Sequence, residues 1–272
     1  MTSRRNLLAL AGGLVAAAVT PRRAWSFQPG GVLAPEDLAN LLESFPSAGE
    51  RLRIDLPQLQ YPGNWNPRPG AMRELATELR LRTRLEPRRD PSVVALDSPN
   101  LFQTPWLYIA GQGGFPSPGE AGEAQLRRFV DLGGMLLFDD ADGGTDRQFE
   151  KDVRALIGRM LPGATIMPVS REHVLYRAFY LVGTPVGRTQ IHGDVLGVQE
   201  EGRLKILIFR NDLGGALARR QDGQHLHPCV PGGAIQREWG IRFAINILLY
   251  ATCTDYKSDP AHVETLLRKH GR

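Results

Sequence analysis

The feature that most constrains the fold is a pair of short segments built almost entirely from apolar residues. Residues 106–110 include no polar residue apart from one tyrosine with its hydroxyl, and residues 135–138 include none. Strands that are apolar throughout are typical of a sheet that is covered on both faces. Helical patterns follow both segments, and such alternation favours parallel pairing of the strands. We therefore predict one α/β domain with an open, mostly parallel sheet and helices on both faces.

Periodicity predicts the remaining elements. Alternating apolar and charged residues predict a strand at 52–56, and apolar residues predict short strands at 93–96 and 164–169. A glycine turn between 195–199 and 204–209 predicts a hairpin. Helical spacing of apolar residues predicts helices that include 72–79, 126–130, 149–160 and 235–250. Ser117 with Glu120, and Thr145 with Gln148, have the spacing of capping boxes at two helix starts.

The N-terminus has the pattern of an export signal. Arg4 and Arg5 precede an apolar run at 7–19, which is shorter than the ~20 residues that a membrane-spanning helix needs. Small residues at Ala24 and Ser26 have the spacing that a signal peptidase reads. We expect a twin-arginine signal cleaved after Ser26 and a periplasmic or other extracytoplasmic protein. The alternative is an uncleaved anchor.

These patterns divide the chain into four parts. We expect a signal peptide at 1–26, an adapter segment at 27–50, the α/β domain at 51–254 and a polar tail at 255–272. No segment after the signal is long and apolar enough to predict a stable membrane span. In an oxidising compartment Cys229 and Cys253 could pair, and the sequence leaves their state open.

The charge of the chain belongs mostly to its leader. The formal net charge is +4, and the first 26 residues hold four arginines and no acid, which leaves 29 basic and 29 acidic residues in the rest. This balance gives no reason to expect nucleic acid as a partner. Nine arginines lie between residues 51 and 89 against four acids. A phosphate-binding face is one interpretation, but the arginine bias of the whole chain favours a solvated, ion-paired surface.

Several motifs together resemble a known family. They are Leu-Gln-Tyr-Pro-Gly-Asn-Trp at 59–65, Tyr-Ile-Ala-Gly-Gln-Gly-Gly at 108–114, Gly-Gly-Met-Leu-Leu-Phe-Asp-Asp at 133–140, Glu-His-Val-Leu-Tyr-Arg-Ala-Phe-Tyr at 172–180, Arg-Asn-Asp-Leu-Gly at 210–214, Asn-Ile-Leu-Leu-Tyr-Ala at 246–251 and Asp-Tyr-Lys-Ser-Asp-Pro-Ala-His at 255–262. The combination resembles the uncharacterised bacterial family called domain of unknown function 4159. The resemblance implies a class I glutamine amidotransferase-like, flavodoxin-like fold, and it implies no activity.

The amidotransferases carry a cysteine at a tight turn between a strand and a helix. The turn after residues 106–110 holds Gln112 instead. Glutamine hydrolysis through a cysteine nucleophile therefore does not carry over from the resemblance, since a shared fold does not imply a shared function.

Candidate site residues lie where predicted strands end, because ligands in open α/β sheets bind beyond the carboxyl ends of the strands. Asp139 and Asp140 end one apolar strand, so they could bind a divalent metal, act as a general base or cap the next turn. His173 could add a metal ligand or a base to this pair. Asn211 and Asp212 follow another strand and either line a pocket or form a turn.

Two further loops are candidate ligand sites. Gly111, Gln112 and Gly113 could let the backbone approach an anion, or could form a simple tight turn. The loop after residues 52–56 contains Tyr61, Asn64 and Trp65. Its aromatic rings could offer a platform for a sugar or peptide, although anchoring the loop against the sheet is the favoured role.

His225, His227 and Cys229 form the third candidate cluster. Alternate spacing would place all three side chains on one face of an extended segment, and histidine and cysteine are ligands for transition metals. The neighbouring Pro228 and glycines indicate an irregular loop, and the spacing matches no established zinc motif. A role in redox chemistry or metal trafficking is the weakest of the hypotheses.

The sequence favours an exported, non-catalytic protein that binds a small ligand or a partner protein of the cell envelope. The alternative is a metal-assisted hydrolase of a carbohydrate or another envelope component, in which Asp139, Asp140 and His173 would hold a divalent metal or act as acid and base. Metal content and the stability of Asp139 and Asp140 variants distinguish the two.

Overall fold

The computed structural model describes residues 53–257, with the side chains of residues 54–252. The predicted signal at 1–26 and adapter at 27–50 lie outside the described residues. The predicted tail at 255–272 also lies outside them, apart from residues 255–257, which belong to the last helix.

A seven-stranded sheet forms the centre of the domain, with the strand order β4-β2-β5-β6-β9-β8-β7. The strands are β2 (Gln58–Leu59), β4 (Val93–Val94), β5 (Trp106–Gly111), β6 (Met135–Asp140), β7 (Ile166–Pro168), β8 (Leu196–Glu200) and β9 (Arg203–Phe209). The first five in this order pair in parallel, and β8 and β7 add an antiparallel pair at the end. A separate small sheet pairs β1 (Arg53–Ile54) with β3 (Glu86–Pro87).

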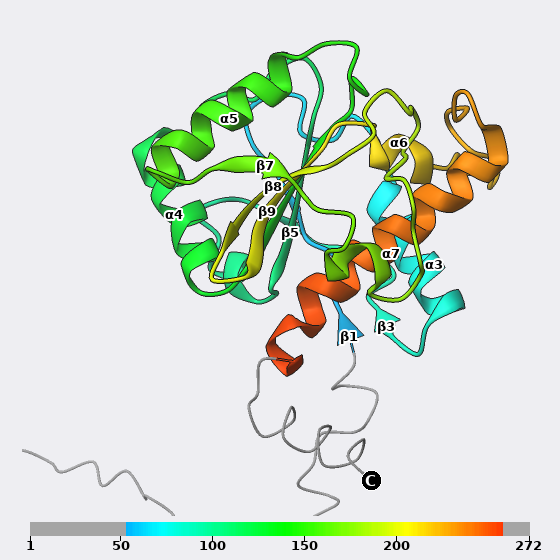
Figure 1. Cartoon of the computed structure of the whole chain (residues 1–272), viewed down its shortest axis with the longest axis horizontal. Helices are drawn as coiled ribbons and strands as arrows, with labels where there is room; N and C mark the ends of the chain where they lie inside the picture. Colours follow the sequence, from blue (N-terminus) through cyan, green and yellow to red (C-terminus); the bar gives the residue numbers. More distant parts are fainter. Residues whose placement is uncertain (1–52, 258–272) are drawn as a thin grey trace, which may run out of the picture. The chain divides into compact units, whose positions relative to one another are not determined.

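Helices cover both faces of the sheet, as the apolar strands predicted. They are α3 (Ala71–Arg82), α4 (Gly119–Asp131), α5 (Gln148–Met160), α6 (Leu213–Leu217), α7 (Gly233–Lys257) and the short 3-10 helices η1 (Pro99–Phe102) and η2 (Val174–Arg177). Figure 1 shows α4 and α5 on one side of the sheet and α3, α6 and α7 on the other. Two apolar cores result, one on each face.

Every residue of β5 and β6 is buried, which explains their uniformly apolar composition. The hairpin between β8 and β9 is also confirmed, and it turns through Glu201 and Gly202, both with positive φ. The predicted strand at 52–56 is wrong in detail, because the pairing breaks into β1 and β2.

Both predicted capping boxes are wrong. Helix α4 begins at Gly119, and the Ser117 hydroxyl accepts a hydrogen bond from the N–H of that residue rather than from Glu120. At α5 the Thr145 hydroxyl donates to the carbonyl of Asp142, and Asp146 accepts the N–H of Gln148. In both places a different local hydrogen bond takes the hydroxyl that the box would have used.

The strand order reverses its direction beside β2, and such a place is called a topological switch point. The chain runs from β2 through α3 to β4 on one side, and then returns across β2 to β5. Helix α3 packs on one face and α4 on the other, so the loops that follow β2 and β5 diverge. In open α/β sheets such a point, at the carboxyl ends of the strands, is where ligands bind.

Candidate functional site

The carboxyl ends of β5, β6 and β9 bring most of the candidate residues together. Asp139 and Asp140 pair with Ala110 and Gly111 of β5, and Asp139 also lies opposite Phe209, the last residue of β9. Asn211 and Asp212 follow β9 directly. The acids and the glycine turn therefore lie together at the carboxyl ends of the parallel strands.

Asp139 is fully buried and accepts three hydrogen bonds from the protein. Its Oδ2 accepts from the Tyr108 hydroxyl at 2.6 Å and from the N–H of Gly214 at 2.7 Å, and its Oδ1 accepts from the N–H of Leu213 at 2.8 Å. Burial, followed by repulsion from Asp212, raises its pKa to about 6 even though the hydrogen bonds favour the charged form. This carboxylate holds the start of α6 against the sheet.

Asp140 has a different environment, since successive side chains of a strand point to opposite faces. It is also buried, and its Oδ1 accepts one hydrogen bond, from the N–H of Asp142 at 2.9 Å. Burial is the main reason that its pKa rises to about 7, and the nearby carboxylates of Asp142, Asp139 and Asp212 add to the rise. Asp140 therefore changes charge near neutral pH.

The raised pKa of Asp140 predicts a pH-dependent stability. The carboxyl has a pKa of about 3.9 in an unfolded chain, so between about pH 4 and pH 7 the folded protein retains a proton that the unfolded chain has released. The free energy of unfolding must then fall as pH rises, by up to ~1.4 kcal/mol per pH unit for this group. We expect Asp140→Asn to be more stable than the wild type at about pH 8, with the difference shrinking as pH falls and vanishing near and below about pH 4.

Urea denaturation of both proteins at four pH values between about 4 and 8 measures this effect. Asp139 titrates in the same direction and is present in both proteins, so the difference between them reports the charge of Asp140, including its repulsion of Asp139. A stability difference that stays constant across this range would contradict the assignment.

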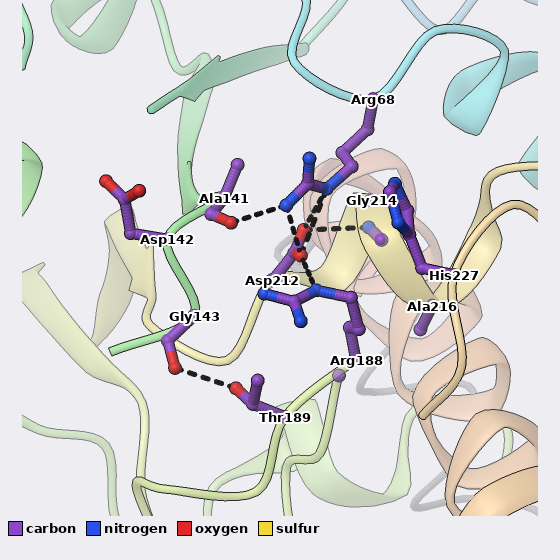
Figure 2. A network of polar contacts seen from close by, with 12 residues as sticks. Arg68, Ala141, Asp142, Gly143, Arg188, Thr189, Asp212, Gly214, Ala216 and His227 are labelled. Atoms are coloured by element: carbon purple, nitrogen blue, oxygen red, sulfur yellow. Dashed lines mark hydrogen bonds and ion pairs between the residues drawn. The ribbon is translucent and has the colours of Figure 1, made fainter. Parts of the chain in front are cut away.

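Asp212 is the centre of an ion network that joins several loops (Figure 2). Arg68 donates from its Nε at 3.0 Å and from its Nη2 at 2.8 Å, and Arg188 donates from its Nε to the same carboxylate. The Arg68 Nη2 also donates to the carbonyl of Ala141 at 2.6 Å. The network fastens the loops after β2, β6 and β9 and the segment before β8.

Asp212 also caps helix α6. Its Oδ1 accepts the N–H of Gly215 at 2.8 Å, and its backbone has φ 55°, in the left-handed region. Aspartate tolerates this region better than most residues because its short side chain bonds locally. The carboxylate is fully buried, with every partner supplied by the protein.

Asn211 fastens the segment that precedes β8. Its Oδ1 accepts the N–H groups of Ile191 and His192 at 3.1 and 2.9 Å, and its Nδ2 donates to the carbonyls of Pro185 and His192 at 2.9 and 2.8 Å. The side chain is buried, and its amide has no hydrogen-bonding capacity left for a ligand.

The glycine turn after β5 is tightly packed. A Cβ at Gly111 would lie 2.2 Å from the Phe149 ring and 2.6 Å from the Tyr61 hydroxyl, so only glycine fits there. The N–H of Gly113 donates to Asp142 Oδ2 at 2.6 Å, which occupies the group that an anion would have used. Gln112 is exposed to solvent.

Tyr61 anchors the loop after β2 rather than presenting its ring to solvent. Its hydroxyl donates to the carbonyl of Ala110 at 2.8 Å, and its ring packs edge-on against Phe115. Trp65 is half-buried and packs against the core on the α4 and α5 face, while Asn64 is exposed. The anchoring role that the sequence favoured fits these contacts.

His173 does not join the acidic pair, so the predicted grouping with Asp139 and Asp140 is wrong. Its ring packs 5.2 Å from that of Tyr250, whose hydroxyl accepts the N–H of Leu204 at 2.8 Å. Leu204 lies near the start of β9, whereas Asp139 lies opposite the end of that strand. The two ends are about 16 Å apart at ~3.3 Å per residue.

The cluster of His225, His227 and Cys229 does not form a metal site. Within residues 54–252, no group of three histidine, cysteine or acidic side chains is arranged to hold a metal ion. Cys229 is a buried free thiol, while the side chain of Cys253 lies outside the described residues. Buried Nδ1 of His225 and Nε2 of His227 lack partners in the described part of the chain, and burial lowers the pKa of both rings.

A pocket of about 360 Å³ lies at the switch point of the sheet, between the loops that follow β2, β4 and β5. Its apolar walls come from three prolines with Tyr61 and Leu96. Its lining residues are Gln60, Tyr61, Pro62, Ala95, Leu96, Asp97, Pro116, Ser117, Pro118, Ala121, Gly122 and Gln125. Of the predicted site residues, Tyr61 alone lines this pocket.

The domain that these elements form has a flavodoxin-like strand order. Numbered along the chain, the five parallel strands follow the order 2-1-3-4-5. Residues 55–252 match the family model described as domain of unknown function (DUF4159), so the chain belongs to that family. A search of curated proteins found no match.

No helix within the described residues is both long and apolar enough to cross a bilayer.

Proposed function

We propose that this protein is an exported, non-catalytic binding protein of the cell envelope, and that it holds a small, mostly apolar ligand in the pocket at the switch point. The pocket of about 360 Å³ carries the proposal, because its position and apolar walls are those of ligand sites in open α/β folds. Twin arginines before a short apolar run support export through the twin-arginine route to the periplasm.

The contacts of Asp139 and Asp212 support a non-catalytic role for these two acids. Asp139 accepts hydrogen bonds from Tyr108 and from two backbone N–H groups, and Asp212 accepts from two arginines and from Gly215. A general base needs a free oxygen that faces the substrate, and a metal ligand needs a free oxygen that faces the metal ion. The oxygens of both carboxylates are instead engaged in contacts that hold the fold.

Filling the pocket tests the proposal. Ala121 lines the pocket on the exposed side of α4, so Ala121→Phe puts a ring into the pocket without entering the core. We expect neutral aromatic fragments that bind the full chain, detected by saturation-transfer NMR, to bind this variant at least about tenfold more weakly, a loss of ~1.4 kcal/mol.

Ala124→Phe is the matched control, because Ala124 is exposed on the same helix and does not line the pocket. Fragments should bind this variant like the wild type. Fragment binding that survives Ala121→Phe unchanged, or that is lost equally in both variants, would count against a ligand in this pocket.

A further inference from the structure

A second hollow lies between α3 and the segment at the end of β3, and three of its seven lining residues are arginines. Its volume is about 390 Å³. Three arginines line it, Arg73, Arg80 and Arg89, together with Ala76, Thr77, Pro87 and Asp90. It lies in the arginine-rich stretch between residues 51 and 89, where the sequence left a phosphate-binding face as one interpretation.

The local sequence explains why a hollow forms here. Arg73, Thr77 and Arg80 recur at helical spacing along α3, so they share one face of the helix. Ala76 lies between them and is buried, and its small side chain leaves space between the longer ones.

The opposite wall is held in place by β3 and its neighbours. The backbone N–H of Arg88 donates to the carbonyl of Ile54 at 2.8 Å, and the side chain of Arg88 pairs with Asp55 at 3.2 Å. Pro87, whose ring fixes its backbone φ angle, lies directly before Arg88 and makes this segment more rigid. These contacts fix the backbone that carries Arg89 and Asp90.

The charges in the hollow do not balance. Asp90 pairs with Arg73, with 3.1 Å between the carboxylate oxygen and Nε. Arg80 and Arg89 have no acidic partner among the residues that the structure describes. Three guanidinium groups therefore face one carboxylate, which leaves an excess of two positive charges. A concave wall concentrates the field of such groups more than a flat surface does.

We propose that this hollow binds a dianionic phosphate group through Arg80 and Arg89. Guanidinium groups match phosphate oxygens with two parallel hydrogen bonds each, and two such groups balance the charge of one phosphate dianion. The phosphate is either a free anion or the phosphomonoester headgroup of a lipid such as phosphatidic acid, because both can carry two negative charges. This site is separate from the apolar pocket and does not rest on the function proposed for it.

The test uses the full chain with two probes at low ionic strength, where screening is weak. Isothermal titration calorimetry measures binding of inorganic phosphate, and co-sedimentation compares vesicles that contain phosphatidic acid with vesicles of phosphatidylcholine alone. The test variant is Arg80→Gln/Arg89→Gln. The control is Arg127→Gln/Arg220→Gln, which removes the same charge from two exposed arginines elsewhere on the surface.

We expect the test variant to bind at least about tenfold more weakly, because it loses two charge-assisted contacts, while the control binds like the wild type. Phosphate binding with this pattern supports a free anion as the ligand. Vesicle binding with this pattern, without binding of inorganic phosphate, supports the lipid headgroup. If the wild type binds neither probe, or if both variants weaken binding equally, the proposal is overturned.

Discussion

Asp212→Asn is expected to lower the free energy of unfolding by about 3–5 kcal/mol, because it leaves the buried Arg68 and the half-buried Arg188 without their acidic partner. The buried carboxylate of Asp212 is the acidic partner of both Arg68 and Arg188. Asparagine tolerates the left-handed backbone at this position, so the substitution removes the charge and leaves the backbone geometry acceptable. The two guanidinium groups would then lose their buried counter-ion. Urea denaturation at neutral pH measures the effect.

Asp90→Asn is the matched control for this experiment. Asp90 also pairs with an arginine, but its side chain is 72% exposed. Exposed ion pairs contribute about 0–1 kcal/mol, so this variant should unfold almost like the wild type. If both variants lost less than about 1 kcal/mol, the network around Asp212 would not be a principal fastening of the fold.

Asp139→Asn is expected to cost about 2–4 kcal/mol, because three buried donors converge on this carboxylate. Asparagine offers one acceptor oxygen, and its amide N–H₂ would face a donor where the second carboxylate oxygen was. Thermal unfolding with and without added divalent metal measures the effect, and we expect the same loss in both conditions. Tyr108→Phe, which removes one of the three donors, should cost less.

The same experiment separates the two functional hypotheses that the sequence raised. A carboxylate that served as a metal ligand or a catalytic base would be replaced with little loss of stability, and elemental mass spectrometry would show a bound metal lost in the variant. If the Asp139→Asn protein had wild-type stability and reduced metal content, the result would favour the hypothesis of a metal-assisted hydrolase.

The sheet could be predicted from the sequence because its central strands are buried on both faces. Residues 106–110 and 135–138 carry that information within each strand, without reference to the rest of the fold. Helix starts could not be predicted equally well. Ser117 and Thr145 have the right spacing for capping boxes, but each makes a competing local hydrogen bond that only the loop geometry decides.

The sequence indicated the cluster of acids at the carboxyl ends of the strands but not the arginines that pair with it, and it indicated only Tyr61 among the residues that line the pocket. Asp139, Asp140 and Asp212 were identified because they follow apolar strands, and they do lie at one edge. Arg68 and Arg188 were missed, since their separations of 144 and 24 residues from Asp212 leave no local pattern. In a chain with 29 arginines, residue type alone does not mark these two. A buried aspartate requires a cation or several hydrogen-bond donors, and this requirement was the available signal in the sequence.

The two edges of the sheet bear on how the folded chain behaves at high concentration. Strand β4 at one edge has two residues, and β7 at the other has three and ends at Pro168, which has no N–H to donate. Long, regular edges invite strands of neighbouring molecules to add to the sheet, which leads to aggregation, and short or proline-bearing edges resist it. The long ladders of β5, β6 and β9 all lie inside the sheet, so the folded domain offers little backbone on which amyloid-like growth could begin.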